Sequence, residues 1–383
     1  MAELRFLTAG ESHGPALTAI LEGIPAGLRL NIDEINRDMA RRQQGYGRGG
    51  RMKIETDRAE LLSGVRFGET LGSPITLRVT NRDWTNWTER MAVFGEPAGG
   101  RVTEARPGHA DLTGVRKYQR QDVRDILERA SARETAMRVA VGAVCKQLLR
   151  ACGMAVASQV INIGGVYADE ALIQKNRWEA HDSGLNCCDS QAEEAMKEKI
   201  RAAKEAGDTL GGIFEVSVKG APPGLGSHIQ WDRRLDARLA GAMMSVQAIK
   251  GVEIGAGFGY AALPGSQAHD EMFYDGERIY RRTNNAGGLE GGMTNGEDIV
   301  LRAVMKPIPT LMKPLHTVDI ATKEAVLASK ERSDVCAVSA ASVVGEAMVA
   351  FVIAQAVVEK FGGDALTDIR QAISAYLERI AGE

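Results

Sequence analysis

The sequence predicts one domain that combines β-strands and α-helices. Alternating apolar runs of strand length, longer runs with helical periodicity, and the lack of a linker-like stretch in the 383 residues support this prediction. With 44% hydrophobic and 25% charged residues, the composition excludes a disordered, collagen-like or coiled-coil protein. We therefore expect residues 1–383 to form a single integrated domain.

The N-terminal half is expected to alternate strands, loops and long helices. Residues 4–8 and 16–22 alternate between apolar and polar side chains, as half-buried strands do. Asn31 caps a helix that we expect to run to about Gln43. The other elements expected in this half are a glycine-rich loop at 44–52, strands at 53–56, 61–66 and 74–80, an irregular stretch at 82–114, and a helix at 131–151.

The C-terminal half continues this alternation and contains a short repeat of a segment in the N-terminal half. Its expected elements are strands at 154–163, 212–219, 250–258 and 298–305, and helices at 191–206, 233–247, 337–361 and 364–380. The segment EGIPAGL at 22–28 is echoed by KGAPPGL at 219–225, and each is followed by a charged amphipathic helix. The echo predicts two similar strand–turn–helix halves.

Charge is distributed unevenly along the chain. The formal net charge is −3, but residues 1–150 carry +5 and the remainder carries −8. The positive part uses 21 arginines and only 3 lysines, and guanidinium groups bind phosphate and carboxylate through paired hydrogen bonds. We therefore expect a small anionic ligand, whereas the overall charge does not favour nucleic acid.

Cysteine usage and hydropathy indicate a cytoplasmic protein that does not enter a membrane. The five cysteines are odd in number and form no CxxC pair, so neither a disulfide framework nor a zinc site is expected. The N-terminus lacks the apolar core of a signal peptide. The most apolar stretch, 335–358, carries Glu346 near its centre and is expected to be a buried helix.

The segment GESHG at 10–14 matches the G-x-S-x-G pattern of serine hydrolases, with Ser12 as the nucleophile. In those enzymes the pattern joins a strand to a helix, but here Pro15 and strand-like residues follow. A serine hydrolase is therefore the less favoured alternative. A tight turn between two strands, or a turn that presents His13 to a site, fits the context better.

Glycine and arginine are concentrated in the segment RRQQGYGRGGR at 41–51. Its G-x-G-x-x-G pattern follows a helix rather than a strand, which excludes a dinucleotide-binding fingerprint. Glycines allow an anion to approach the backbone, and the four arginines would neutralise it. An RNA-binding protein is the alternative function, but Tyr46 is the only aromatic residue at hand for stacking on bases.

Two further segments carry candidate site residues. Arg106, His109 and Asp111 lie within six residues on a loop braced by proline and glycine. Ser131 is a candidate N-cap of the helix at 131–151, and a helix N-terminus attracts anions. The chain has no P-loop, HExxH, EF-hand or CxxC motif. These features predict an enzyme that acts on a small phosphorylated or polycarboxylated substrate.

In their order along the chain, these motifs resemble the chorismate synthase family. The resemblance spans about residues 4–360 and rests on segments 10–14, 41–51, 106–111, 131–134, 207–212, 230–232, 287–296, 306–310 and 332–334. It implies a shikimate-pathway lyase that catalyses the anti-1,4-elimination of phosphate from 5-enolpyruvylshikimate 3-phosphate, giving chorismate for aromatic amino acid biosynthesis. It also implies a homotetramer with an α+β fold, a β-α-β sandwich whose helices pack between antiparallel sheets.

The resemblance implies roles for specific side chains. His13 would protonate the departing phosphate, His109 would protonate or stabilise the reduced flavin, and Asp334 would help to accept the ring proton through the flavin. The two histidines can also be assigned in the opposite order. The residues implied to hold the phosphate and two carboxylates of the substrate are Arg42, Arg48, Arg106, Arg133 and Arg332.

The resemblance also implies a requirement for reduced FMN, although the reaction has no net redox change. The implied FMN-binding residues are Arg129, Ala130, Ser131, Gln247, Ala248, Gly291, Lys306, Pro307, Ile308, Pro309, Thr310 and Arg332. The glycine-rich segment 283–297 is expected to close against the flavin ring and shield it. The sequence does not distinguish a chain that reduces FMN with NADPH from one that depends on a separate reductase.

Overall fold

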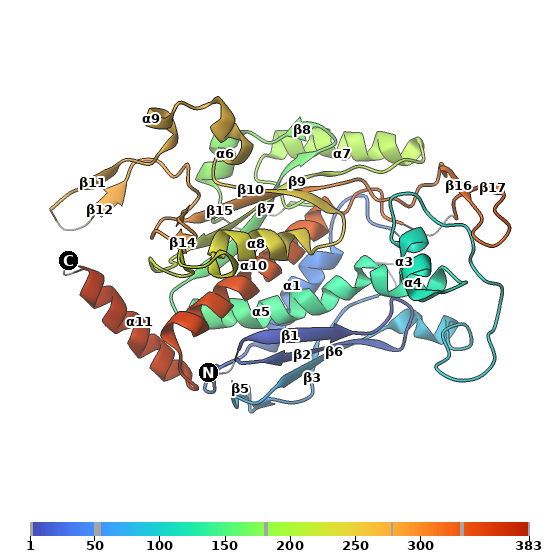
Figure 1. The fold of residues 1–383 in the computed structure, drawn as a ribbon, viewed down its shortest axis with the longest axis horizontal. Coiled ribbons are helices and arrows are strands. Elements are labelled where there is room, and N and C mark those ends of the chain that lie inside the picture. Colours follow the sequence, from blue (N-terminus) through green and yellow to red (C-terminus); the bar gives the residue numbers. More distant parts are fainter. Residues whose placement is uncertain (1–2, 50–54, 180–182, 277–278, 330–332, 382–383) are drawn as a thin grey trace.

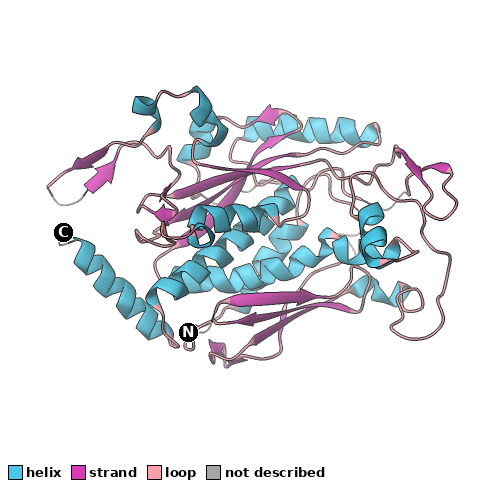
Figure 2. Ribbon diagram, in the orientation of Figure 1, coloured by secondary structure: helices cyan, strands magenta, loops and turns pink. Residues whose placement is uncertain are grey.

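Two antiparallel sheets and several layers of helices make up the protein (Figure 1). The computed structural model describes residues 3–49, 55–179, 183–276, 279–329 and 333–381. Long helices lie between the two sheets, and shorter ones cover the outer face of the larger sheet (Figure 2). The fold mixes helices and strands, as the sequence predicts.

The smaller sheet is built from the first 80 residues. Its strands are, in spatial order, β1 (Arg5–Ala9), β2 (Ala16–Glu22), β6 (Ile75–Thr80) and β3 (Glu60–Leu61). Leu17, Leu21 and Leu77 are fully buried on its inner face and alternate with more exposed residues, as the period of a strand requires. A short hairpin beside it consists of β4 (Val65–Arg66) and β5 (Glu69–Thr70).

The larger sheet comes from the middle of the chain. Its strands are, in spatial order, β10 (Ile249–Ile254), β15 (Ile299–Met305), β9 (Gly212–Lys219), β7 (Ala155–Ile163) and β8 (Val166–Tyr167). The peripheral hairpins pair β11 (Met272–Tyr274) with β12 (Ile279–Arg281), β13 (Leu289–Glu290) with β14 (Met293–Thr294), and β16 (His316–Val318) with β17 (Ala325–Leu327).

Two long helices join the sheets through one apolar core. Helix α5 contacts β2 and β6, α10 contacts β7 and β9, and the two helices pack against each other. The helices are α1 (Ile32–Gln43), α3 (Asp111–Tyr118), α4 (Arg124–Ala130), α5 (Thr135–Ala151), α6 (Glu170–Lys175), α7 (Ser190–Glu205), α8 (Leu235–Met244), α9 (Gly265–Ala268), α10 (Val338–Phe361) and α11 (Leu366–Ala381). One cluster of buried apolar side chains, with members from Leu4 to Ile373, forms this core.

Helix α10 is apolar enough to be mistaken for a membrane span. It has 24 residues with a mean hydropathy of 2.0 over its most apolar window, but 94% of that window is buried inside the protein. Glu346 near its centre forms ion pairs with Arg41 of α1 and Lys146 of α5. Helix α10 is therefore a central helix of the core, as Glu346 within its apolar stretch led us to expect.

The two echoing segments form the same turn. In the first, Thr70 Oγ1 accepts a hydrogen bond from the N–H of Leu28 at 2.9 Å and donates to the carbonyl of Pro25 at 2.6 Å. In the second, Thr294 Oγ1 accepts from Leu225 N–H at 2.8 Å and donates to the carbonyl of Pro222 at 2.6 Å. The sequence echo thus corresponds to a repeated local structure.

Most of the predicted elements are present, with boundaries shifted by a few residues, but the stretch 82–114 is less irregular than expected. It contains a 3₁₀-helix at Arg82–Asn86 and the start of α3, and α4 and α6 were also not predicted. Glycine at 114 argues against a helix, but a Cβ there would lie 2.3 Å from Ile126, so glycine lets α3 and α4 pack closely. Of the strand expected at 53–56, residues 53 and 54 lie outside the described residues and 55–56 form a loop.

Helices α3 and α4 form a hairpin with a small apolar cluster of its own. Val115, Val123 and Leu127 are buried in this cluster, which is separate from the main core. The hairpin lies at the end of α5 that faces the β1–β2 turn (Figure 1). It places several side chains next to the candidate site.

Candidate functional site

One cavity brings together most of the side chains singled out from the sequence. Its volume is about 440 Å³, which is within the range of ligand pockets. The predicted residues that line it are His13, Arg42, Arg48, Arg106, His109, Ala130, Ser131, Arg133, Gln247, Ala248, Lys306, Ile308, Pro309, Thr310 and Asp334. The fold therefore gathers them in one place, while their chemical roles stay predictions.

Arg42 and Arg133 both line the cavity and share the buried carboxylate of Asp57. Asp57 Oδ2 lies 2.6 Å from Arg133 Nη1 and 3.4 Å from Arg42 Nη1. Burial lowers the pKa of Arg42 to about 10; Asp57 opposes this effect, whereas Arg133 and Arg48 add to it. Arg42 is still a cation at neutral pH, and repulsion between neighbouring guanidinium groups favours an added anion.

Arg48 enters the cavity from the loop that follows α1. Its Nη1 lies 2.9 Å from Asp334 Oδ2, and the backbone N–H of Gly49 donates to Oδ1 of the same carboxylate at 2.6 Å. Asp334 is the only carboxylate among the described lining residues, whereas five arginine and lysine side chains line the same wall. The side chains that line the cavity are therefore net positive, and the buried carboxylates of Asp57 and Asp111 behind them balance part of this charge.

His109 lies on the loop before α3, beside a buried carboxylate. Its Nδ1 forms a hydrogen bond with Asp111 Oδ1, and Arg106 Nε donates to Oδ2 of Asp111 at 2.8 Å. Burial opposes ionisation of Asp111, but the hydrogen bonds from His109 and Arg106 hold its pKa well below the ordinary value. Asp111 is thus a carboxylate that orients two side chains of the cavity.

His13 lies on the turn between β1 and β2. Gly10 in this turn has a φ of 108°, and a Cβ there would lie 2.4 Å from the carbonyl oxygen of Ala16, so the turn requires glycine. The imidazole stacks on Trp87 with ring centroids 4.0 Å apart, and its Nδ1 lies 2.9 Å from Glu128 Oε2. Each candidate histidine therefore faces a buried carboxylate through Nδ1.

Another wall combines an apolar surface with a few polar groups. Ala340, Ala341 and Val344 of α10 line it. Gln247 Oε1 is buried there and has no hydrogen-bond partner within the described part of the chain. Ala248 has a φ of 69°, a left-handed conformation that costs a non-glycine residue about 1–2 kcal/mol. An unpaired acceptor beside an apolar wall suits a planar heterocycle that carries an N–H donor.

Three of the predicted FMN-binding residues that the structure describes do not line this cavity. Arg129 is exposed, donates to the carbonyl of Gly10 at 3.2 Å, and lines a neighbouring cavity. Pro307 is not among the lining residues although its neighbours in sequence are. Gly291 lies in the turn between β13 and β14, and Arg332 lies outside the described residues.

The glycine-rich segment 283–297 also lies away from the cavity in this chain. Asp270 accepts hydrogen bonds from the backbone N–H groups of Asn285 and Ala286, both at 2.8 Å. None of the described residues of this segment lines the cavity. The expected closure of the segment over a bound flavin is therefore not formed within a single chain.

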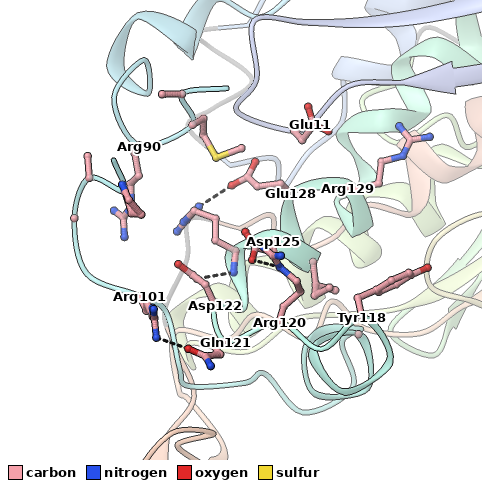
Figure 3. A pocket seen from close by; sticks show the side chains of 18 of the residues that line it. Glu11, Arg90, Arg101, Tyr118, Arg120, Gln121, Asp122, Asp125, Glu128 and Arg129 are labelled. Carbon is pink, nitrogen blue, oxygen red and sulfur yellow. Dashed lines mark hydrogen bonds and ion pairs between the residues drawn. The ribbon is translucent and has the colours of Figure 1, made fainter. Parts of the chain in front are cut away.

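A larger cavity of about 1290 Å³ adjoins the first one (Figure 3). Its wall mixes acidic and basic side chains that pair with one another. Arg120 Nε lies 2.6 Å from Asp125, and Arg124 Nη1 lies 2.7 Å from Glu128. The described lining of the larger cavity carries six carboxylates and six basic side chains, whereas that of the smaller one carries one carboxylate and five basic side chains, so the smaller cavity is the better anion site.

The geometry favours neither alternative function. The GESHG turn joins two antiparallel strands rather than a strand and a helix, and the His13 ring bonds Glu128. In the arginine-rich segment, Arg41 donates to both carboxylate oxygens of Glu346 at 2.9 and 2.8 Å. Because Arg42 and Arg48 line the cavity, the described part of the segment, residues 41–49, presents no arginine platform for RNA.

Three residues that hold side chains of the cavity in place were not identified from the sequence: Asp57, Trp87 and Glu128. Glu128 follows Arg124 by four positions, a spacing typical of an ordinary surface ion pair. Trp87 lies in the stretch 82–114 that was expected to be irregular, and nothing else in the sequence marks it. Asp57 had no signal, because its partners Arg42 and Arg133 lie 15 and 76 positions away.

Comparisons with known proteins agree on one family. A family model described as "Chorismate synthase" matches residues 4–358. A protein named "Chorismate synthase" from Geobacter sulfurreducens is 59% identical and the match covers 98% of this chain and 99% of that protein; another from Syntrophotalea carbinolica is 59% identical, with 99% of both covered. A solved structure titled "Crystal Structure of Chorismate Synthase" matches 100% of this chain and 99% of its own, with a TM-score of 0.81 and 47% identity.

Proposed function

Because the chain belongs to the chorismate synthase family and is a lyase of the shikimate pathway, we propose that its arginine-lined cavity binds 5-enolpyruvylshikimate 3-phosphate and expels the phosphate to form chorismate. The observation that supports this site is its charge. Five cationic side chains face a single carboxylate, Asp334, among the described lining residues. The phosphate and two carboxylates of the substrate complement that charge.

The arginines act on the charge that develops during the elimination. The bond between the ring carbon and the phosphate oxygen breaks, a ring hydrogen leaves, and a new ring double bond forms, so negative charge grows on the phosphate. Asp57, Asp111 and Asp334 already hold the guanidinium groups of the cavity in place. Cations fixed in this way stabilise the departing phosphate without rearranging.

Two imidazoles and one carboxylate are available for proton transfer. We assign His13 as the acid that protonates the departing phosphate, and His109 and Asp334 as the groups that hold protons elsewhere in the cavity. Each of the three lines the cavity, and each histidine is held by its own carboxylate. Histidine suits such a role because it can gain or lose a proton near neutral pH.

The residues of the apolar wall fit a flavin. Gln247 offers a buried oxygen without a partner, Lys306 offers a cation on the loop beside it, and α10 offers a flat apolar surface. These residues, with Ser131 and Ala248, would hold reduced FMN, which would supply electron density to the reacting ring without net redox change. The Lys306 side chain donates to the carbonyl of Gly108 and is thereby held at the cavity wall.

The activity is tested by phosphate release under anaerobic conditions. The protein is mixed with 5-enolpyruvylshikimate 3-phosphate and FMN reduced by dithionite, and one molecule of phosphate is expected per molecule of chorismate formed. A second arm supplies oxidised FMN and NADPH, and phosphate release there would show that the chain reduces its own cofactor. Absence of phosphate with fully reduced FMN would contradict the proposed function.

Replacing Gln247 with leucine tests the flavin site. The change removes the unpaired buried acceptor, and we expect the Kd for FMN to rise about 3–10-fold, the effect of losing one hydrogen bond. Titration of FMN fluorescence measures this affinity. Gln174→Leu on α6, where the side chain is exposed and outside the cavity, is the matched control. An unchanged Kd in Gln247→Leu would place FMN elsewhere.

The assembly and location of the protein remain part of the proposal. We infer that the protein is a cytoplasmic homotetramer and that each subunit is a β-α-β sandwich with helices between its sheets. Exposed apolar side chains on the β11–β12 hairpin support contacts between subunits. Met272, Tyr274 and Ile279 there are each at least 66% exposed. Gly291 lies outside the cavity of its own chain, so contact with FMN would have to be made in a neighbouring subunit.

A further inference from the structure

His13 is bound to helix α4 through both its backbone and its ring. The N–H of His13 donates to Glu128 Oε2 at 2.8 Å, and Nδ1 lies 2.9 Å from Oε2 and 3.0 Å from Oε1. The preceding residue, Ser12, donates its backbone N–H to the carbonyl oxygen of Glu128 at 3.1 Å. One residue of α4 therefore fixes the position of the turn and the orientation of the imidazole.

The surroundings of Glu128 require an ionised carboxylate. Besides the two nitrogens of His13, Nη1 of Arg124 donates to Oε1 at 2.7 Å. An ionised carboxylate can accept from all of these groups, whereas an amide would turn a donor of its own toward one of them. Burial opposes ionisation, but the ring and backbone of His13 and the Arg124 side chain lower the pKa of Glu128 below its ordinary value.

An acceptor at this position fixes the tautomer of His13. Since Glu128 cannot donate, Nδ1 must carry the proton of the neutral ring. Nε2 is the remaining nitrogen; it makes no hydrogen bond to any described residue, and His13 lines the cavity. Trp87 stacks on the ring at an interplanar angle of 29° and restricts its rotation.

We propose that Glu128 is a positioning residue that holds His13 with Nδ1–H toward the carboxylate and Nε2 toward the cavity, so that the proton given to the departing phosphate leaves from Nε2. This inference rests on the proposed function for the identity of the proton acceptor. The orientation of His13 can be tested without substrate or flavin. Glu128 itself lines the larger cavity and touches no part of the smaller one.

The tautomer is measured by two-bond ¹H–¹⁵N correlation spectra of the full chain labelled with ¹⁵N at its six histidines. The signals that disappear in His13→Gln identify His13. At a pH where the ring is neutral, we expect the Nδ1–H form in the unaltered protein and the Nε2–H form in Glu128→Gln, because the amide can turn its NH₂ toward Nδ1. Glu128→Asp keeps a carboxylate and is expected to retain the Nδ1–H form. An Nε2–H form in the unaltered protein, or no change in Glu128→Gln, would overturn the inference.

Kinetics then separate positioning from a general structural role. Glu128→Gln is expected to lower kcat for phosphate release roughly 10²-fold with little change in KM, as loss of acid catalysis does. In a His13→Gln background the same change is expected to have no further effect, because a residue that acts through His13 adds nothing once His13 is gone. Glu128→Asp is expected to recover most of the activity.

Glu215→Gln is the matched control. Glu215 is 1% exposed and pairs with Arg177 and Arg302 in the larger sheet, outside both cavities. The Glu215→Gln variant is expected to have an unchanged kcat even if the substitution lowers the free energy of unfolding. A further loss on adding Glu128→Gln to His13→Gln would contradict the positioning role. If the unaltered protein releases no phosphate while the tautomer responds as expected, the proposed function fails and the orientation of His13 stands.

Discussion

Replacing Arg48 with alanine is expected to lower kcat/KM for phosphate release roughly 10²–10³-fold, the cost of removing one preorganised donor from a developing negative charge. The Arg48 side chain is only 10% exposed and is held by Asp334 at 2.9 Å, so it needs no rearrangement to face the departing phosphate. Alanine also leaves Asp334 without this partner, facing an anionic substrate. Both effects act in the same direction.

The measurement is the anaerobic rate of phosphate release with saturating reduced FMN. Arg48→Lys keeps the charge but loses the planar pair of donors, so partial recovery is expected. Arg150→Ala on α5 is the control, because Arg150 forms an exposed ion pair with Glu34 and its side chain is 61% exposed. Equal rates for Arg48→Ala and Arg150→Ala would remove Arg48 from the site.

Replacing Glu346 with glutamine is expected to lower the free energy of unfolding by about 3–5 kcal/mol, the typical cost of removing one partner from a buried ion pair. Glu346 is 2% exposed at the centre of α10, where Arg41 donates to both of its oxygens and Ser158 Oγ donates at 2.7 Å. Lys146 approaches the same carboxylate from α5. The amide would leave the cations of Arg41 and Lys146, both partly buried, with Asp38 as their one remaining carboxylate partner among the described residues.

The same variant is expected to change the pH dependence of unfolding. Burial opposes ionisation of Glu346, but Lys146 and Arg41 lower its pKa far below the ordinary value. A carboxylate with a lowered pKa in the folded state stabilises the fold above its unfolded pKa, and this contribution is lost on acidification. The gap between the unaltered protein and Glu346→Gln should therefore narrow below about pH 4.5.

Urea denaturation at several pH values measures both effects. Glu359→Gln on the same helix is the control, since Glu359 is 53% exposed and pairs with Arg238 at the surface. That change is expected to cost at most about 1 kcal/mol. Similar losses of stability in the two variants would show that the central ion pairs contribute no more than a surface pair.

Long elements with clear periodicity could be predicted from the sequence, and short ones could not. Helix α1 begins at the predicted cap, where Asn31 Oδ1 accepts from Asp33 N–H at 2.9 Å. Helix α10 was recognisable because Glu346 interrupts an apolar run of membrane-spanning length. The short helices α3 and α4 have few apolar positions each, and they depend on packing against each other that no local pattern encodes.

The sequence predicts which arginines and histidines form the site, but not the hydrogen-bond partners that hold them in place. Arginines and histidines in glycine-braced motifs were identifiable because their surroundings do not suit helices or strands. Their buried partners were not, because Glu128 is 115 positions from His13 and only the fold brings them together.

The α3–α4 hairpin has a consequence for the whole site. Asp111 stands at the start of α3 and Glu128 near the end of α4, so both imidazoles depend on a unit held together largely by Val115, Val123 and Leu127. A tilt of that unit would move both imidazoles together. Substitutions that weaken the apolar contacts between α3 and α4 would therefore also disturb the positions of both histidines.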